Sequence, residues 1–418
     1  MSPLRRPRLA VALAAVLGIL PAATHAEVTR PWTETRTRTL APGIVHATGT
    51  METRGGLRQA VQVATIDLAD PTVRLRALLS NDRVLGLERP SLLAERKSTP
   101  AARAIVATNG DVSVAGAWDA LAAPLSLHVA DGEVMVAQEC ATPTLSVDAN
   151  GTARIGTVKV LVRVDLGYRI PGTWREEIQV KGVNTERRAD EAILYTPRFG
   201  GRTPTDARGT EAILAVADTL PPSGSICATV VDVRRDAGRT PLAAGRFVLS
   251  GSGSVAREVA LLAPGDTVTI RTDVVPRGAT PCGPTDGPLA AWGSIVDAIG
   301  GNHYVARDGR NAAPTTRDYP KGAELAPRTS VGVTADGRVL LVVVDGRQPG
   351  YSVGVTLREM GTLMLRLGAV SAFNLDGGGS SVMATRRPGA PRITVSNRPS
   401  DGSERALTQA LAIFSSAP

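Results

Sequence analysis

Alternating apolar and polar positions, the pattern typical of β-strands, recur along most of the chain. The alternation is clear over residues 59–67, and a similar pair of segments flanks the tight-turn sequence Asp131-Gly132. Alternation predicts half-buried strands, and such a dipeptide favours a two-residue hairpin. We therefore expect a β-rich N-terminal region over residues 27–100, followed by antiparallel hairpins.

The C-terminal quarter combines two apolar segments with one helical pattern. Residues 339–344 are apolar on both faces, which is typical of a central strand. Thr356 and Glu359 have the spacing of a capping box, and the apolar positions after them recur at helical intervals up to Gly368. A second apolar segment, residues 369–375, then completes a strand–helix–strand sequence.

This order of elements predicts a right-handed crossover between two parallel strands. Together with the upstream hairpins, it predicts an α+β fold. The expected architecture is a mixed β-sheet with packed helices, a C-terminal βαβ unit that carries a glycine-rich turn, and a β-rich N-terminal region.

Each strand of the predicted βαβ unit ends in an acidic residue. Asp345 follows the first strand and Asp376 the second. Parallel strands end at the same edge of a sheet, which is where ligands bind in open sheets. A third acid, in Asn109-Gly110-Asp111, would join them if its strand lies parallel in the same sheet. For Asp345, a turn-forming role and a catalytic role are equally open.

A glycine-rich turn follows the second strand directly. It consists of Asn374, Leu375, Asp376, Gly377, Gly378, Gly379, Ser380 and Ser381. Glycines admit positive φ and let a ligand approach the backbone closely. Successive N–H groups in such a turn form an anion nest, and serine hydroxyls add donors. Three glycines favour a phosphate-binding role over a purely structural tight turn, because one or two glycines would be enough for such a turn.

Composition and motif spacing exclude several function classes. Aromatic residues make up 3% of the chain, so platforms for stacking nucleic-acid bases are scarce. The formal net charge is +8, but the arginines are scattered, and we expect no nucleic-acid partner. The histidines have no zinc-binding spacing. The turn fits neither the Gly-x-Ser-x-Gly nucleophile elbow nor a Walker loop.

Residues 1–26 have the features of a secretory signal peptide. Arginines precede an apolar run over residues 9–20, and small residues follow up to Ala26. The run is shorter than the roughly 20 residues that a spanning helix needs, and no later segment approaches that length. We therefore expect a secreted or periplasmic bacterial protein with no transmembrane segment after signal removal. Its three cysteines admit one disulfide and one free thiol, with the pairing left open.

Several C-terminal segments resemble the motifs of the phosphodiester glycosidase family. They are residues 328–332, 344–347, 356–359 and 374–383, in this order. Weaker similarities begin near residue 101. The lysosomal member of this family removes N-acetylglucosamine from a phosphodiester-linked mannose. The resemblance implies a phosphodiester glycosidase domain over residues 101–418, after the signal peptide (1–26) and the β-rich region (27–100).

The resemblance also implies a reaction and a set of site residues. The reaction is cleavage of the glycosidic bond of a sugar-1-phosphodiester in a glycan or envelope polysaccharide, which releases the sugar and a phosphomonoester. The candidate catalytic residues are Asp376, Asp345 and Asp111. The candidates for binding substrate or phosphate are Asn109, Arg328, Arg347, Asn374, Gly377, Gly378, Gly379, Ser380, Ser381 and Arg405. A guanidinium can bind two phosphate oxygens at once.

Two alternatives remain open at this point. We expect no required cofactor, yet the oxygens of Asn109, Asp111 and Asp376 are of the kind that calcium or magnesium prefers. The chain could also be a non-catalytic envelope protein that binds anionic polysaccharide through the same arginines and glycine turn.

Overall fold

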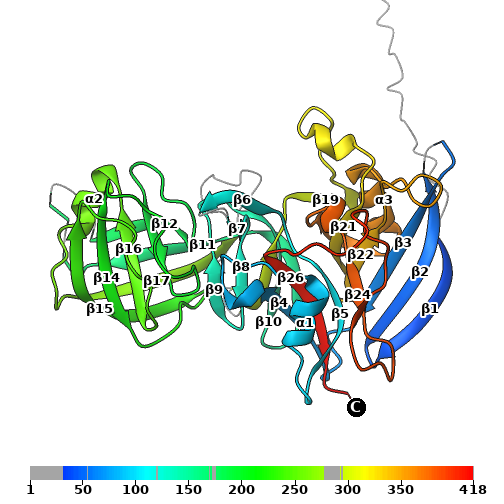
Figure 1. Cartoon of the computed structure of the whole chain (residues 1–418), viewed down its shortest axis with the longest axis horizontal. Helices are drawn as coiled ribbons and strands as arrows, with labels where there is room; N and C mark the ends of the chain where they lie inside the picture. The colour runs from blue at the N-terminus through cyan, green and yellow to red at the C-terminus, as the bar shows by residue number, and fades with distance from the viewer. Residues whose placement is uncertain are drawn as a thin grey trace, which may run out of the picture.

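The computed structural model describes residues 32–53, 55–118, 121–168, 170–171, 176–276, 292 and 295–417. The predicted signal peptide, residues 1–26, lies outside these ranges, as does Cys282. The described chain consists mainly of β-strands. Its three α-helices are α1 (Pro90–Arg96), α2 (Gly253–Val259) and α3 (Leu357–Arg366). Figure 1 shows a barrel at one end of the molecule and layered sheets at the other.

The predicted α+β fold class, a mixed β-sheet with packed helices, is wrong. The described strands form sheets of eleven, eight, five and two strands, and part of the largest sheet closes into a barrel. Antiparallel neighbours can be joined by short turns, whereas parallel neighbours need long crossovers that are usually helical. Because most neighbouring strands here are antiparallel, the chain builds large sheets with few helices. The protein is therefore β-rich.

Seven strands form the closed barrel. In order around it they are β11 (Ala153–Asp165), β12 (Glu177–Val183), β13 (Ala192–Tyr195), β16 (Arg246–Gly251), β14 (Thr210–Val216), β15 (Gly224–Arg235) and β17 (Thr267–Pro276), which pairs with β11. In β11, buried Val158, Val160, Val162 and Val164 alternate with more exposed residues and pack into the barrel core. This alternation is the pattern that a closed sheet requires, since every strand has one inner and one outer face.

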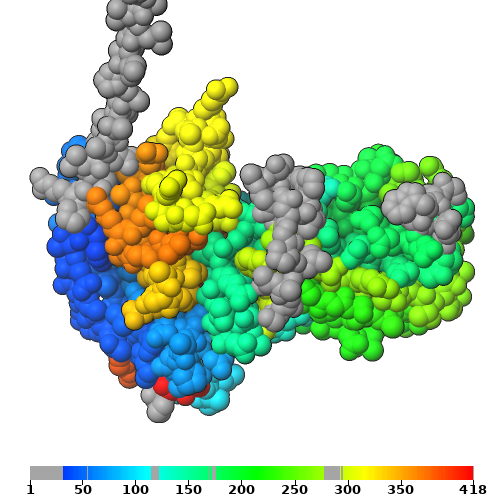
Figure 2. All heavy atoms as spheres, turned by 180° about the vertical axis from the view of Figure 1, so that it is seen from behind, coloured from blue at the N-terminus to red at the C-terminus, as the bar shows by residue number. Residues whose placement is uncertain are grey.

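Further strands extend this sheet from β11 toward the rest of the molecule. They are β10 (Thr142–Asp148), β18 (Ile295–Gly300), β8 (His128–Ala130) and β9 (Glu133–Val136). A separate two-stranded sheet contains β6 (Ser113–Trp118) and β7 (Leu121–Pro124). Figure 2 shows the barrel as a lobe of its own, with the N-terminal strands at the opposite end of the molecule.

The eight-stranded sheet combines N-terminal and C-terminal strands. Its order is β1 (Thr33–Ala41), β2 (Ile44–Thr53), β3 (Leu57–Ile66), β22 (Val339–Val344), β21 (Arg328–Thr334), β23 (Ala369–Asn374), β19 (His303–Arg307) and β20 (Arg310–Asn311). Strand β22 is buried on both faces, as its apolar sequence predicts. Strand β3 pairs with β22, so residues of the predicted N-terminal region lie in the same sheet as the C-terminal motifs. The predicted domain boundary at residue 100 stays a prediction.

A five-stranded sheet packs against one face of the eight-stranded sheet. Its order is β25 (Thr394–Val395), β24 (Met383–Thr385), β5 (Arg103–Asn109), β26 (Gln409–Ser415) and β4 (Val73–Leu79). Residues such as Val343 and Phe373 of the larger sheet share one core with Ile105 and Ile413 of the smaller sheet. Helix α3 begins at the capping box of Thr356 and packs in another core, which includes residues from the opposite face of the larger sheet.

The ends of two strands in the larger sheet define where the site lies. Strands β22 and β23 are both antiparallel to β21, which lies between them. They therefore run parallel to each other and end on the same side of the sheet. Strand β5 belongs to the smaller sheet, where its neighbours β24 and β26 are antiparallel to it. Hence Asp111 does not arrive through a third parallel strand of the larger sheet.

Two further observations concern the cysteines and the helices. Cys140 is disulfide-bonded, and Cys227 is a free, exposed thiol. Among the described residues, no helix is long and apolar enough to cross a membrane.

Candidate functional site

The glycine-rich turn is the connection between the two packed sheets. Strand β23 ends at Asn374 in the eight-stranded sheet, and β24 begins at Met383 in the five-stranded sheet. Residues 375–382 therefore pass from one sheet to the other. The turn lies at the seam of the sandwich, with the end of β5 beside it.

Asn109, the last residue of β5, fixes the turn from the neighbouring sheet. Its fully buried amide Nδ2 donates to the carbonyl oxygen of Asp376 at 2.8 Å, and its Oδ1 accepts from the Thr329 hydroxyl at 2.7 Å and the Val382 N–H at 3.2 Å. The Asp376 N–H in turn donates to the Gly110 carbonyl oxygen at 3.0 Å. Asn109 therefore holds the turn in place, and both the donor and the acceptor of its amide are already used within the protein.

Asp111 and Asp376 are brought together by these contacts. Asp111 is buried, and burial, with a further contribution from the charge of Asp376, raises its pKa to about 7. One of its oxygens accepts a short hydrogen bond from Ser126, and the other has no partner. Asp376 is half-buried, and its Oδ1 accepts from the Gly377 N–H at 2.8 Å. Two carboxyls in such different environments suit an acid and base pair.

Asp345 lies at the same side of the sheet but is held by internal hydrogen bonds. Its Oδ1 accepts from Asn397 Nδ2 at 2.7 Å, and its Oδ2 accepts from the Tyr351 hydroxyl at 3.0 Å and the Arg398 N–H at 3.1 Å. Burial raises the pKa of Asp345, and these donors oppose the rise. Both oxygens are thus occupied, which favours a role in positioning the surrounding loops.

Buried polar atoms without partners gather around the turn. They are Asp111 Oδ1, Ser330 Oγ, Asn374 Oδ1, Ser380 Oγ and Ser381 Oγ. Ser330 and Asn374 lie directly opposite each other in the β21–β23 pair. A buried polar group without a partner is costly, and native proteins contain few of them. Their concentration at one place makes the turn a candidate site for a polar ligand.

The backbone N–H groups of the turn are largely used within the protein. Gly378 donates to the Pro327 carbonyl oxygen at 2.8 Å, Ser380 to Gly377 at 3.3 Å and Ser381 to Gly378 at 3.2 Å. The hydroxyls of Ser380 and Ser381, by contrast, keep unused hydrogen-bonding capacity.

The three arginines predicted for phosphate binding have different environments. The guanidinium of Arg328 is buried and donates to the carbonyl oxygens of residues 321, 324 and 355. The guanidinium of Arg405 pairs with Asp401 at 2.6 Å. Arg347 is exposed, and its guanidinium has no hydrogen-bond or ion-pair partner within the described part of the chain, while its backbone N–H donates to the Val353 carbonyl oxygen at 3.1 Å. Of the three, Arg347 is the one with all its guanidinium donors available.

Arg347 lies directly over the glycine turn. A Cβ atom built on Gly378 would be 3.0 Å from Arg347 Nη1 and 3.1 Å from Nη2. Both residues have positive φ, 63° at Gly378 and 59° at Arg347. Positive φ is uncommon for a non-glycine residue and is often found at functional sites. The absence of a side chain at Gly378 leaves room for the guanidinium above the turn.

Gly379 is equally restricted by its neighbours. A Cβ atom there would lie 2.2 Å from Arg405 Nη2 and 2.3 Å from Asp401 Oδ2. The Asp401–Arg405 ion pair therefore packs onto the turn, and a side chain at position 379 would displace it.

The donor set considered for calcium or magnesium fits poorly. Asn109 Oδ1 already accepts two hydrogen bonds, so Asp111 and Asp376 remain as the oxygen ligands of that set. Among the described residues, no group of three or more His, Cys, Asp or Glu side chains could hold a metal ion. A reaction without a required cofactor stays a prediction.

Sequence reasoning missed several residues that support the site. Ser126 contacts Asp111, Thr329 contacts Asn109, and Gln409 donates to the Asp111 carbonyl oxygen at 3.4 Å. Asn397 joins Asp345 to the Ser381 carbonyl oxygen, at 3.3 Å. Thr329 and the unpartnered Ser330 both lie inside the segment 328–332 that carries the family resemblance. Each of the contacts above joins residues far apart in the sequence, so no local spacing pairs these residues with the site.

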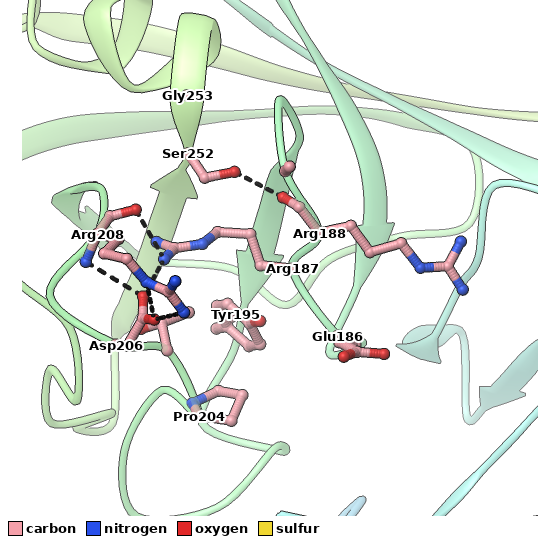
Figure 3. A pocket seen from close by; sticks show the side chains of 11 residues that line it. Glu186, Arg187, Arg188, Tyr195, Pro204, Asp206, Arg208, Ser252 and Gly253 are labelled. Atoms are coloured by element: carbon pink, nitrogen blue, oxygen red, sulfur yellow. Dashed lines mark hydrogen bonds and ion pairs between the residues drawn. The ribbon is translucent and has the colours of Figure 1, made fainter.

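The barrel contains a separate cavity of about 460 Å³, shown in Figure 3. Its lining includes Arg187, Arg188 and Arg208 beside Asp206. Arg187 donates to the Ser250 hydroxyl at 2.8 Å and pairs with Asp206, which also pairs with Arg208. These groups mainly satisfy one another. The unpartnered polar atoms and the paired carboxyls at the glycine turn make that turn the stronger candidate for chemistry.

Comparison with known proteins agrees with this location. Residues 228–414 match the model of the family described as phosphodiester glycosidase, and the match includes the whole glycine turn. A prophage-derived uncharacterized protein of Bacillus subtilis, YomE, is 36% identical over 107 residues, which cover 25% of this chain and 16% of that protein.

Two solved structures show the same fold. A hypothetical protein from Synechocystis aligns with a TM-score of 0.68 and 18% identity, over 92% of this chain and 64% of that one. A candidate exported protein from Burkholderia pseudomallei aligns with a TM-score of 0.64 and 23% identity, over 86% and 74%. The chain thus spans less than two thirds of the length of the Bacillus and Synechocystis proteins. Within this chain, residues 228–414 are the part that matches the phosphodiester glycosidase family.

Proposed function

We propose that the protein is a secreted or periplasmic hydrolase that cleaves the glycosidic bond of a sugar-1-phosphodiester in a glycan or envelope polysaccharide. The products are the free sugar and a phosphomonoester. The observation that carries the proposal is the set of unpartnered donors at the turn, Ser380, Ser381 and Arg347, beside the carboxyl pair of Asp111 and Asp376. The export of the protein rests on the predicted signal peptide.

The donors at the turn suit a phosphodiester. The free guanidinium of Arg347 can bind two phosphate oxygens, and the hydroxyls of Ser380 and Ser381 can donate to the same group. Charged hydrogen bonds of this kind contribute about 1.5–3 kcal/mol each. A phosphate is a good leaving group once its charge is neutralised, so binding of the phosphate assists the cleavage itself.

The two carboxyls suit the remaining steps. Asp111, whose pKa is about 7, is largely protonated below that pH and can donate a proton to the leaving oxygen. Asp376, with one oxygen left free by Gly377, is the nucleophile or the base that activates water. In this assignment Asp345 positions Asn397, and through it the carbonyl of Ser381.

The test is release of free sugar from a panel of sugar-1-phosphodiesters by the purified protein. The variant Asp376→Asn should lose turnover by about a hundredfold to ten-thousandfold, the range expected for a general acid or base, and retain substrate affinity. The exposed Asp308→Asn is the matched control and should keep full activity. The same assay with added chelator tests the metal-dependent alternative. If the chelator abolishes activity and calcium or magnesium restores it, the enzyme requires a metal ion.

The main rival is a non-catalytic envelope protein that binds anionic polysaccharide at the same turn. It predicts binding of the polymer with no sugar released from any diester in the panel. That result would refute the hydrolase proposal. Equal loss of turnover in Asp376→Asn and Asp308→Asn would refute the assignment of Asp376.

A further inference from the structure

A basic groove lies between the N-terminal edge of the eight-stranded sheet and the β24–β25 hairpin. It has a volume of about 220 Å³. Its lining consists of Arg36, Arg38, Leu40, His46, Thr48, Thr385, Arg387 and Ser396. On strands β1 and β2, Arg36 lies opposite Thr48 and Arg38 opposite His46, so these four residues face the groove together. We call it the basic groove.

The charges in the basic groove are all positive. Its lining includes three arginines and no Asp or Glu. None of the guanidiniums of Arg36, Arg38 and Arg387 has a hydrogen-bond or ion-pair partner among the residues that the structure describes. Most arginines elsewhere in this protein that line cavities are paired, as in the barrel cavity. Three unpaired guanidiniums around one concavity repel one another, and a bound anion would relieve that repulsion.

His46 and the hydroxyls add hydrogen-bonding groups without adding negative charge. Burial lowers the pKa of His46, and the charges of Arg38 and Arg387 lower it further, so the ring is neutral at neutral pH. Its Nε2 lies 2.8 Å from Gln62 Oε1. Thr48 and Ser396 are half-buried and line the same space. The groove therefore offers fixed donors around a positive potential.

One segment separates the basic groove from the glycine turn. Gln62, which contacts His46, donates through Nε2 to the Ser396 carbonyl oxygen at 3.0 Å. The next residue, Asn397, donates to Asp345 at 2.7 Å and to the Ser381 carbonyl oxygen at 3.3 Å. Ser396 thus lines the groove, while Asn397 contacts the glycine turn. The basic groove and the glycine turn are therefore connected through two adjacent residues.

We propose that the basic groove is a second anion subsite, which binds a phosphate or other anionic group of an extended sugar-phosphate polymer while another diester of the same polymer lies at the glycine turn. The proposal deepens the proposed function and rests on it for the identity of the scissile bond. A nucleic acid is the less suitable polymer, because the groove lining contains no Phe, Tyr or Trp on which bases could stack.

The kinetic test compares a synthetic sugar-1-phosphodiester oligomer with the corresponding single diester. In Arg38→Glu, KM for the oligomer should rise by about tenfold or more, the loss expected for one charged hydrogen bond, while kcat and the kinetics of the single diester stay unchanged. The matched control is Arg310→Glu, the same charge change in strand β20 at the opposite edge of the same sheet. The proposal is overturned if Arg38→Glu affects both substrates equally, or neither.

A binding test separates this proposal from the proposed function. Calorimetric titration with long-chain inorganic polyphosphate should show about tenfold weaker binding for Arg38→Glu or Arg36→Glu than for Arg310→Glu, even if no diester is ever hydrolysed. Weaker polyphosphate binding by the groove variants, without hydrolysis of any diester, would support the anion subsite and refute the hydrolase proposal. Equal weakening by all three variants would overturn the groove, as would tighter binding of single-stranded DNA than of polyphosphate at matched phosphate number. Melting temperatures identify any variant that fails to fold, and the other groove variant then supplies the comparison.

Discussion

Replacing Asp111 with asparagine should remove a pH-dependent loss of stability that the wild type carries. The carboxyl is buried beside Asp376, and its pKa rises from an ordinary value of 3.8 to about 7 in the folded protein. A group whose pKa is raised by folding contributes stability in full below the unfolded pKa and loses it as the pH rises through the folded pKa. Asparagine resembles the neutral carboxyl and has no proton to lose.

The magnitude follows from the size of the pKa change. A difference of about 3 pH units, at 1.36 kcal/mol for each unit, corresponds to at most about 4 kcal/mol. The free energy of unfolding of Asp111→Asn minus that of the wild type should therefore increase by up to about 4 kcal/mol between about pH 4 and about pH 7, and stay constant above that. Other carboxyls largely cancel in this difference because both proteins contain them.

Urea unfolding followed by circular dichroism at a series of pH values measures this difference directly. A difference that does not change with pH would refute the claim that burial keeps Asp111 protonated. Asp297 offers a parallel test, since burial also raises its pKa to about 7. Asp297→Asn should show the same trend in stability while leaving sugar release unchanged, whereas Asp111→Asn should reduce sugar release.

Three further substitutions test the geometry of the turn. Gly379→Ala should reduce turnover and lower Tm slightly, because the new methyl group would displace the half-exposed ion pair packed on the turn. Arg347→Ala should raise KM by about tenfold with little change in Tm, because its guanidinium has no partner in the described part of the protein. Asp345→Asn should lower the free energy of unfolding by about 1–3 kcal/mol. Both carboxylate oxygens of Asp345 accept hydrogen bonds, and the amide NH2 of asparagine would replace one of these acceptors with a donor. Steady-state kinetics and thermal melting measure these effects.

Control variants are available for these substitutions, and each prediction has a result that would contradict it. Gly201→Ala should be neutral, since a Cβ atom there would contact nothing within 4 Å. Arg310→Ala should leave KM unchanged. If Gly379→Ala melts and turns over like the wild type, the ion pair does not restrict the turn. An unchanged KM in Arg347→Ala would remove that arginine from phosphate binding. Loss of turnover without loss of stability in Asp345→Asn would restore Asp345 to a catalytic role.

Local elements were predictable from the sequence, but their assembly was not. The capping box at Thr356 and the apolar strand over residues 339–344 depend on neighbouring residues, and both are present in the structure. Closure of the barrel depends on the pairing of β11 with β12 and on the parallel pairing of β12 with β13. No local pattern specifies such pairings. The one clear helical pattern led to the expectation of a mixed sheet with packed helices, and this α+β prediction was wrong.

The same distinction applies to the candidate site. The glycines, serines and Asp376 are contiguous, so their motif is legible in the sequence. The contribution of Asn109 depends on a contact with Asp376 that spans 267 positions, and β5 reaches the turn from a different sheet than the prediction assumed. The different environments of Arg328, Arg347 and Arg405 depend on carbonyl and carboxylate partners that only the folded chain supplies.

The passage of the glycine turn from one sheet to the other has a consequence for how activity arises during synthesis. The hydroxyls of Ser380 and Ser381 acquire their positions only when both sheets are formed and docked. The last strand, β26, must also be in place, because it flanks β5 and carries Gln409, which contacts Asp111. A chain that is still being synthesised therefore lacks the candidate site even if its barrel has folded. The candidate site is therefore complete only when the whole fold is complete, and under the proposed function a partly folded chain would release no sugar.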